Sequence, residues 1–302
     1  MVAARLQRSI GDALEAYAAG FEAMGRLSRS HRLYDGGWHP TAVCGAAGAA
    51  RAASVVLGLD AERAGAAERL ALLQAGGLRA AFGSDGKSLQ VGLAAAAGVQ
   101  AARIAAGAVS ITADVLDAPD GFAAAFGAPR DRGAGLAVDE NWIKPWPCCL
   151  MSHSAIEAAT RADLSGSAPI AVAVHPVARR AAAYDEVADG LQAKFSIPYL
   201  VAYVALRGEP EPSSFNAVDP DVQELARGRV SLTTDAALRE SEAVLSLAGE
   251  EVARVQASRG SPQRPMSPEQ LAAKCHMLAG DRLDGLLDDR DAPAQALLDA
   301  LA

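Results

Sequence analysis

Apolar residues near the start of the chain recur at three- and four-residue spacing, which is typical of an amphipathic helix. The pattern predicts a helix over 9–28 and is carried by Ile10, Leu14, Tyr17, Phe21 and Met24. Alanine-rich segments continue the helical pattern and predict further helices over 42–59, 60–77, 88–107, 109–116 and 120–126. Gly45 and Gly48 in the helix over 42–59 predict close contact between helices, and Asp60 and Glu62 predict the start of the helix over 60–77. Repeated alanine-rich helices favour a bundle over alternating β-α units.

The pattern changes after Trp142. A proline-rich loop predicts the end of the helical segment. The pattern then predicts helices over 152–163 and 189–207, and strands over 169–176, 228–235 and 243–256, with a turn near Gly249. Ser267, Pro268 and Glu269 are typical of a helix start. We therefore expect a mainly α protein, in which an all-helical domain (1–142 plus 262–302) carries an inserted, smaller α+β lid domain (143–261). The cleft between the two domains is the expected site.

Composition and charge narrow the classes of function. The 302 residues carry a net charge of −8, and no basic stripe is present that would neutralise the phosphates of a nucleic acid. Charged residues within the first turns break any signal-peptide core, and no uncharged apolar stretch predicts a membrane span. The four cysteines form no CxxC pattern and fit a reducing compartment. We expect a cytoplasmic protein that binds neither nucleic acid nor membrane.

Two glycine-rich turns carry candidate cations. His39 lies in the turn Gly36–Thr41, directly before a predicted helix, where a protonated imidazole would add to the attraction of a helix N-terminus for anions. The alternative is that His39 only caps or stacks in a tight turn. Lys87 ends the turn Gly83–Lys87 at another predicted helix start, which suits a carboxylate or a phosphate, and Arg79 lies upstream as a second cation. The alternative for Lys87 is a solvated surface lysine.

Two further segments carry polar side chains beside prolines. In KPWPCCLMSH, His153 opens a predicted helix, and Cys148 is either a nucleophile or, together with Cys149, a buried small residue. In AKFSIPY, Lys194, Ser196 and Tyr199 offer hydrogen-bond donors beside a proline that predicts a kink or a helix start. His31, His175 and His276 are interpreted as structural or surface residues. The sequence contains no metal-ligand spacing and no dinucleotide fingerprint, so these groups predict anion binding and proton movement.

Five segments, in this order, resemble the MmgE/PrpD family: GWHPTAVCGAAGAARAASVVLGLD, QAGGLRAAFGSDGKSLQVGLAAAAGVQAARIAAGA, KPWPCCLMSHSAIEAA, AKFSIPY and RGSPQRPMSPEQLAAKCHMLAG. The similarity runs from about residue 10 to the C-terminus. The resemblance implies a helical domain with an α+β lid, a homodimer, and activity without a metal or an organic cofactor. Members include 2-methylcitrate dehydratase, cis-aconitate decarboxylase and iminodisuccinate epimerase. The resemblance also implies an N-terminally short chain, because the family's Asp-rich helix has no counterpart here.

The resemblance implies a lyase or isomerase that removes a proton α to a carboxylate of a small di- or tricarboxylic acid, in the manner of a dehydratase, decarboxylase or epimerase. Fixed cations would stabilise the enediolate-like state.

The family's cleft residues fall on His39, Lys87, His153, Lys194–Ser196 and, nearby, Tyr199. We expect catalysis from His153, Lys87, His39 and Tyr199, with His153 or Tyr199 as the proton shuttle, and substrate binding by Arg79, Lys194 and Ser196. The family's lysine motif reads Lys-Pro-Leu-His where this chain has Gln90, which cannot take a proton. The alternative is a catalytically impaired or split paralogue that serves as a binding or assembly subunit.

Overall fold

The computed structural model describes residues 1–30, 32–127 and 135–301, so His31 lies outside the described residues. The chain forms two compact units. The first, here called the helical unit, contains Met1–Ala81, Gly86–Glu140 and Pro268–Ala302. The second, the mixed unit, contains Phe82–Asp85 and Asn141–Ser267. The fold is mainly α with one small sheet, as the sequence predicts, and the lid arrangement stays a prediction.

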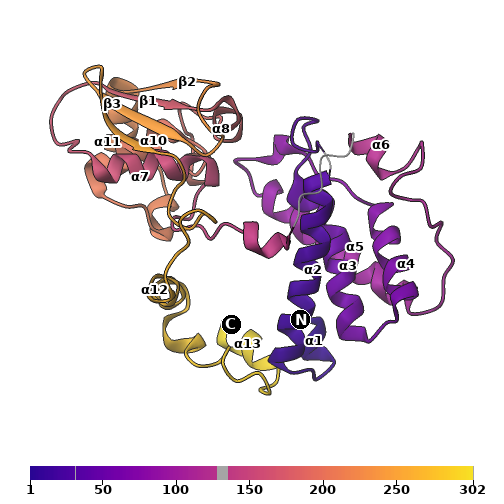
Figure 1. Ribbon diagram of the computed structural model, residues 1–302. Helices are drawn as coiled ribbons and strands as arrows, with labels where there is room; N and C mark the ends of the chain where they lie inside the picture. Colours follow the sequence, from indigo (N-terminus) through magenta and orange to yellow (C-terminus); the bar gives the residue numbers. More distant parts are fainter. Residues whose placement is uncertain (31, 128–134, 302) are drawn as a thin grey trace. The chain divides into compact units, whose positions relative to one another are not determined.

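The helical unit is built around α3 (Pro40–Leu57), which packs against α2 (Ile10–Ser30), α4 (Ala61–Leu72) and α5 (Gly86–Ala105) (Figure 1). Alanines fill the core between these helices and allow their backbones to approach closely. The other described elements of this unit are α1 (Val2–Arg5), η1 (Arg79–Ala81), α6 (Phe122–Phe126), η2 (Ala137–Glu140), α12 (Pro268–Ala279), η5 (Gly280–Leu283) and α13 (Gln295–Leu301).

Local signals explain where the helices begin. Asp60 caps α4 by accepting a hydrogen bond from the backbone N–H of Arg63, as expected, although α4 ends before the predicted position. The predicted helix over 109–116 is wrong, because this segment is extended and then turns. Ala108 has a φ of 59°, which ends the helical path, and the β-branched residues that follow favour an extended chain.

The helix α3 is, among the described helices, the one that is long and apolar enough to cross a membrane. The sequence-based expectation concerned uncharged stretches, and α3 contains Arg51, so that expectation stays a prediction. However, 56% of this helix is buried inside the protein, against α2, α4 and α5. Burial on several sides explains its apolar composition as that of a central core helix.

The mixed unit contains a four-stranded sheet in the order β2-β1-β3-β4. The strand β1 (Ile170–Val174) pairs in parallel with β2 (Val230–Thr234) and antiparallel with β3 (Ala243–Leu247), which forms a hairpin with β4 (Glu250–Val255). The hairpin turns at Ala248 and Gly249, where both φ angles are positive. The helices α7 (His153–Arg161) and α10 (Ile197–Arg207) contact strands of this sheet.

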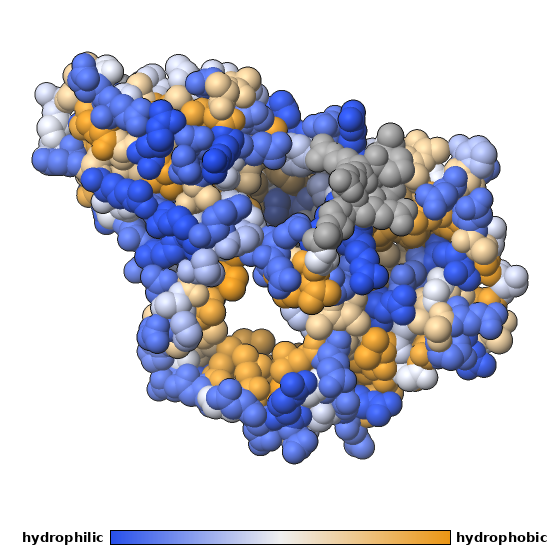
Figure 2. Space-filling view, viewed as in Figure 1, coloured by the Kyte–Doolittle hydropathy of each residue, from blue (hydrophilic) through white to orange (hydrophobic). Residues whose placement is uncertain are grey.

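The predicted helix over 189–207 is two helices in the structure. The helix α9 (Gly190–Ala193) ends before Lys194, and Ser196 caps α10, which has Pro198 in its first turn. The alternative of a helix start at the proline is thus confirmed. The remaining elements of the unit are η3 (Leu150–Ser152), α8 (Pro176–Ala181), η4 (Pro212–Phe215) and α11 (Pro220–Arg229). Figure 2 shows that hydrophobic residues are exposed on the viewed face of the molecule, interspersed with hydrophilic residues.

Candidate functional site

The turn that carries His39 is held by backbone pairing with the segment that precedes η1. The His39 N–H donates to the carbonyl of Gly77 at 3.0 Å, and the Arg79 N–H donates to the carbonyl of Gly37 at 2.9 Å. Trp38 and Leu78 form an antiparallel bridge between these hydrogen bonds. The turn Gly36–Thr41 and the segment Gly77–Arg79, which are far apart in the sequence, therefore lie side by side at the N-terminus of α3.

The imidazole of His39 is buried, with only 3% of the residue exposed. Its Nδ1 lies 2.7 Å from Nε2 of Gln90, which comes from the first turns of α5. Burial, with a smaller contribution from the charge of Lys87, lowers the pKa of His39 to about 4. The expectation of a protonated His39 is therefore corrected: at neutral pH this imidazole is uncharged, because both its surroundings and its cationic neighbour oppose a second proton.

Lys87 is the second residue of α5, at the predicted helix start. It is half-buried and close enough to His39 to act on the pKa of that residue. Arg79 is placed differently, since its guanidinium lies 4.0 Å above the ring centroid of Tyr34 and donates to the Tyr34 carbonyl at 2.7 Å. The structure thus brings Lys87 and His39 together, while Arg79 stacks on an aromatic ring.

His153 begins α7 in the mixed unit, as predicted, and has no exposed surface. Its ring meets the edge of Trp146 with centroids 5.2 Å apart. The indole N–H of Trp146 donates to Glu209 at 2.7 Å, and Arg259 lies 5.6 Å over the indole ring while also pairing with Glu209. The position of His153 is therefore fixed by an aromatic ring that is itself held by an acid and an arginine.

Tyr199 is fully buried in the mixed unit, in one cluster with Trp146 and Cys148. Its hydroxyl oxygen accepts a hydrogen bond from the backbone N–H of Asp219 at 2.9 Å. Burial raises the pKa of Tyr199, and the nearby Asp219 carboxylate adds to the rise. A tyrosine is suited to proton transfer only when its pKa is lowered toward neutral, so the raised pKa does not favour Tyr199 as a proton shuttle.

The other predicted donors have structural partners. The Ser196 hydroxyl accepts from the backbone N–H of Tyr199 and caps α10, and the Lys194 ammonium lies 5.4 Å from the ring centroid of Phe215. Cys148 and Cys149 are buried, and burial raises the pKa of the Cys148 thiol. This confirms the interpretation of both cysteines as buried small residues, because a nucleophilic thiol needs a lowered pKa.

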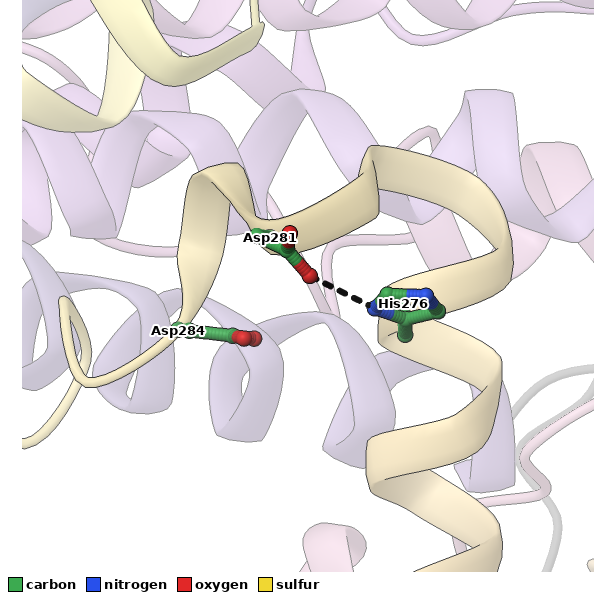
Figure 3. A group of neighbouring side chains, drawn as sticks. All are labelled: His276, Asp281 and Asp284. Carbon is green, nitrogen blue, oxygen red and sulfur yellow. Dashed lines mark ion pairs between the residues drawn. The ribbon is translucent and has the colours of Figure 1, made fainter.

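Within the described residues, His276, Asp281 and Asp284 form one group whose ligand atoms lie within 4.8 Å of one another (Figure 3). All three side chains are exposed, and His276 pairs with Asp281 at 3.1 Å. Exposed carboxylates at the end of a helix are common without a bound ion, so this group is not included in the candidate site.

Two models of one protein family match this chain. The MmgE/PrpD N-terminal domain matches residues 1–133, and the MmgE/PrpD C-terminal domain matches residues 146–300. The chain belongs to the MmgE/PrpD family. One human relative of this MmgE/PrpD chain, cis-aconitate decarboxylase, is 30% identical to it over 159 residues. That match covers 49% of the chain and 33% of the human protein, so the chain spans about a third of this relative.

The sequence did not predict the contact of Gln90 with His39, because the amide in place of the family's histidine was interpreted only as the loss of a group that can take a proton. Its spacing of three residues from Lys87 contained the signal, since positions i and i+3 share one face of a helix. The structure places Gln90 against His39, while His153 and Tyr199 belong to the mixed unit.

Proposed function

We propose that this MmgE/PrpD chain takes part in lyase or isomerase chemistry on a small di- or tricarboxylic acid, and that the reaction begins with removal of a proton α to a carboxylate. The observation that carries the proposal is the buried, uncharged His39 beside the cationic Lys87 at the N-terminus of α3. A cation and a helix N-terminus stabilise a carboxylate, and a neutral imidazole adds a hydrogen-bonding group without added charge.

The steps divide among the residues as follows. Lys87 and His39 bind the carboxylate that gains charge as the α-proton leaves. His153 is the proposed proton shuttle, and Tyr199, whose raised pKa disfavours proton transfer, is assigned no step. The enediolate-like state then loses hydroxide, loses carbon dioxide, or regains a proton on its other face. Family membership and the name of the human relative support this class of reaction.

Proton abstraction is tested by deuterium exchange in heavy water. Citrate-, aconitate- and iminodisuccinate-like acids are incubated with the protein, and NMR follows loss of the α-proton signal, whichever product forms. Lys87→Met is expected to slow the exchange about 100-fold, in the range of removing one charge-stabilising group. Arg103→Met removes an exposed cation from the other end of the same helix and is the matched control. Equal exchange rates in both variants would remove Lys87 from the mechanism.

The second candidate is a binding or assembly subunit without turnover, which Gln90 favours, since it stands where the family's lysine motif has a histidine. Calorimetric titration of the same acids distinguishes the two. Binding that is weakened by Lys87→Met, without any deuterium exchange, is the result expected of a binding subunit.

A further inference from the structure

The side-chain amide of Gln90 has one orientation only. Its Oε1 accepts from the backbone N–H of Leu78 at 3.0 Å, and its Nε2 donates to the carbonyl of the same residue at 3.1 Å. Turning the amide over would place its NH₂ against the Leu78 N–H and its oxygen against the Leu78 carbonyl, which are two repulsive contacts. The backbone of Leu78 thus fixes the two ends of the amide without reference to any hydrogen position.

Gly77 makes this arrangement possible. A Cβ at this position would lie 3.2 Å from Oε1 of Gln90 and 2.6 Å from the Cβ of Ala42. The φ of Gly77 is +126°, a backbone conformation that glycine adopts without strain. The carbonyl of Gly77 also accepts from the His39 N–H, so one glycine positions both the amide and the imidazole.

The fixed amide determines which nitrogen of His39 carries the proton. An amide nitrogen donates hydrogen bonds and does not accept them, so the Nδ1 of His39, 2.7 Å away, has to be the acceptor. In a neutral imidazole one nitrogen accepts and the other carries hydrogen, which places the hydrogen on Nε2. Burial keeps the ring neutral at neutral pH.

We propose that Gln90 is a positioning residue that holds His39 as the Nε2–H tautomer, so that His39 donates a hydrogen bond to the substrate carboxylate and does not act as the base. The tautomer is a property of this chain by itself, whereas the donor role rests on the proposed function. As charge develops on the carboxylate oxygen, a hydrogen-bond donor whose tautomer is fixed beforehand stabilises the transition state without first having to move its proton. Proton removal then belongs to another group.

The test measures the tautomer directly. Protein labelled with ¹⁵N in its histidines gives two-bond ¹H–¹⁵N spectra, in which an N–H nitrogen and a lone-pair nitrogen have well-separated shifts. The signals of His39 are assigned as those lost in His39→Asn. In the wild type we expect Nδ1 with a lone pair and Nε2 with hydrogen at neutral pH. The reverse assignment overturns the inference.

Variants of the amide separate positioning from mere packing. Gln90→Glu replaces the donor with an acceptor, so hydrogen should move to Nδ1 and the pKa of His39 should rise. Gln90→Leu should give a mixture of tautomers. Gln74→Leu removes another amide that lines the same 310 Å³ pocket as Gln90 and should leave the His39 spectrum unchanged. A wild-type tautomer that persists in both Gln90 variants overturns the inference.

Turnover then tests the donor role separately. If the wild type exchanges α-protons, Gln90→Leu should slow the exchange about 10- to 100-fold, the range seen when a group that orients a functional histidine is removed. An unchanged rate alongside a changed tautomer would overturn the donor role. The expected tautomer without exchange in the wild type would refute the proposed catalytic function and leave the tautomer assignment confirmed.

Discussion

Two glycines of α3, one turn apart, provide a matched pair for measuring helix packing. Gly48 lies where α3 crosses α2: a Cβ there would be 2.7 Å from the carbonyl oxygen of Gly20 and 3.0 Å from the Cβ of Met24. Gly45 has open space, since a Cβ there would meet nothing within 4 Å. The sequence predicted close contact at both positions, so the prediction is confirmed at Gly48 and wrong at Gly45.

The substitutions Gly45→Ala and Gly48→Ala have the same effect on helix propensity, and they differ in their effect on the packing of α3 against α2. Each gains about 1 kcal/mol, because alanine has a higher helix propensity than glycine in a helix interior. Only Gly48→Ala forces the backbones of α3 and α2 apart by several tenths of an ångström, and overpacking of this kind costs about 1–3 kcal/mol. We therefore expect Gly45→Ala to be more stable than the wild type, and Gly48→Ala to be less stable than Gly45→Ala by about 1–3 kcal/mol.

Thermal and urea unfolding of the wild type and both variants, followed by far-UV circular dichroism, measures the difference. For a protein of this size each kcal/mol shifts Tm by about 2–4 °C, which is readily resolved. The comparison between the two variants cancels the propensity term, so it isolates the contact between helices. A Gly48→Ala protein as stable as Gly45→Ala would show that the crossing of α2 and α3 is not close, and the packing argument for the helical unit would fail.

Three further predictions concern pH, a buried carboxylate and assembly. The pKa of His39 is about 4 in the folded chain and 6.5 without perturbation, so the unfolded chain takes up a proton first as pH falls. The free energy of unfolding is therefore highest above pH 6.5 and declines toward pH 4, by at most about 3 kcal/mol relative to His39→Asn. Urea unfolding of both proteins across this pH range measures the decline. Glu157 is 7% exposed, accepts a hydrogen bond from the Arg259 N–H at 2.7 Å and pairs with Arg264 at 2.7 Å. Glu157→Gln should therefore destabilise the protein by about 2 kcal/mol in denaturant unfolding, the range for a hydrogen bond to a charged group, and an unchanged midpoint would contradict this. Leu89 and Leu93 of α5 are 65% and 72% exposed, which supports the prediction of a homodimer; light scattering that gives the monomer mass would refute it.

Sequence periodicity predicted α2 because its apolar positions repeat every three or four residues over many turns, whereas the richness in alanine predicted α5. It failed where the pattern was short or ambiguous. Val109 and Ile111 have apolar spacing that a short helix shares with an extended chain, and α11 was missed because only Val222 and Ala226 of that helix are buried. Periodicity reports one buried face, so elements that bury little are poorly defined by it.

The candidate site shows the same limit in chemical terms. The place of Lys87 at a helix start followed from its flanking glycine, which is a local signal. The charge of His39 did not, because its pKa depends on burial and on a lysine 48 positions along the chain, which are properties of the tertiary structure. Gln90 illustrates the point most clearly, since its hydrogen bonds involve His39 and Leu78, neither of which is adjacent in the sequence.

An amide at position 90 also has a consequence that a histidine would not have. Gln90 does not titrate, so its hydrogen bond to His39 keeps one polarity from neutral pH down to the pKa of His39, about 4. In Gln90→His the second imidazole could donate or accept, and the protonation of the two rings would be coupled. We therefore expect the ring ¹⁵N shifts of His39 to stay constant in the wild type from neutral pH until the ring begins to protonate close to its pKa of about 4, and to change already at higher pH in Gln90→His. Constant shifts in both proteins would show that the backbone, and not the residue at position 90, determines the tautomer.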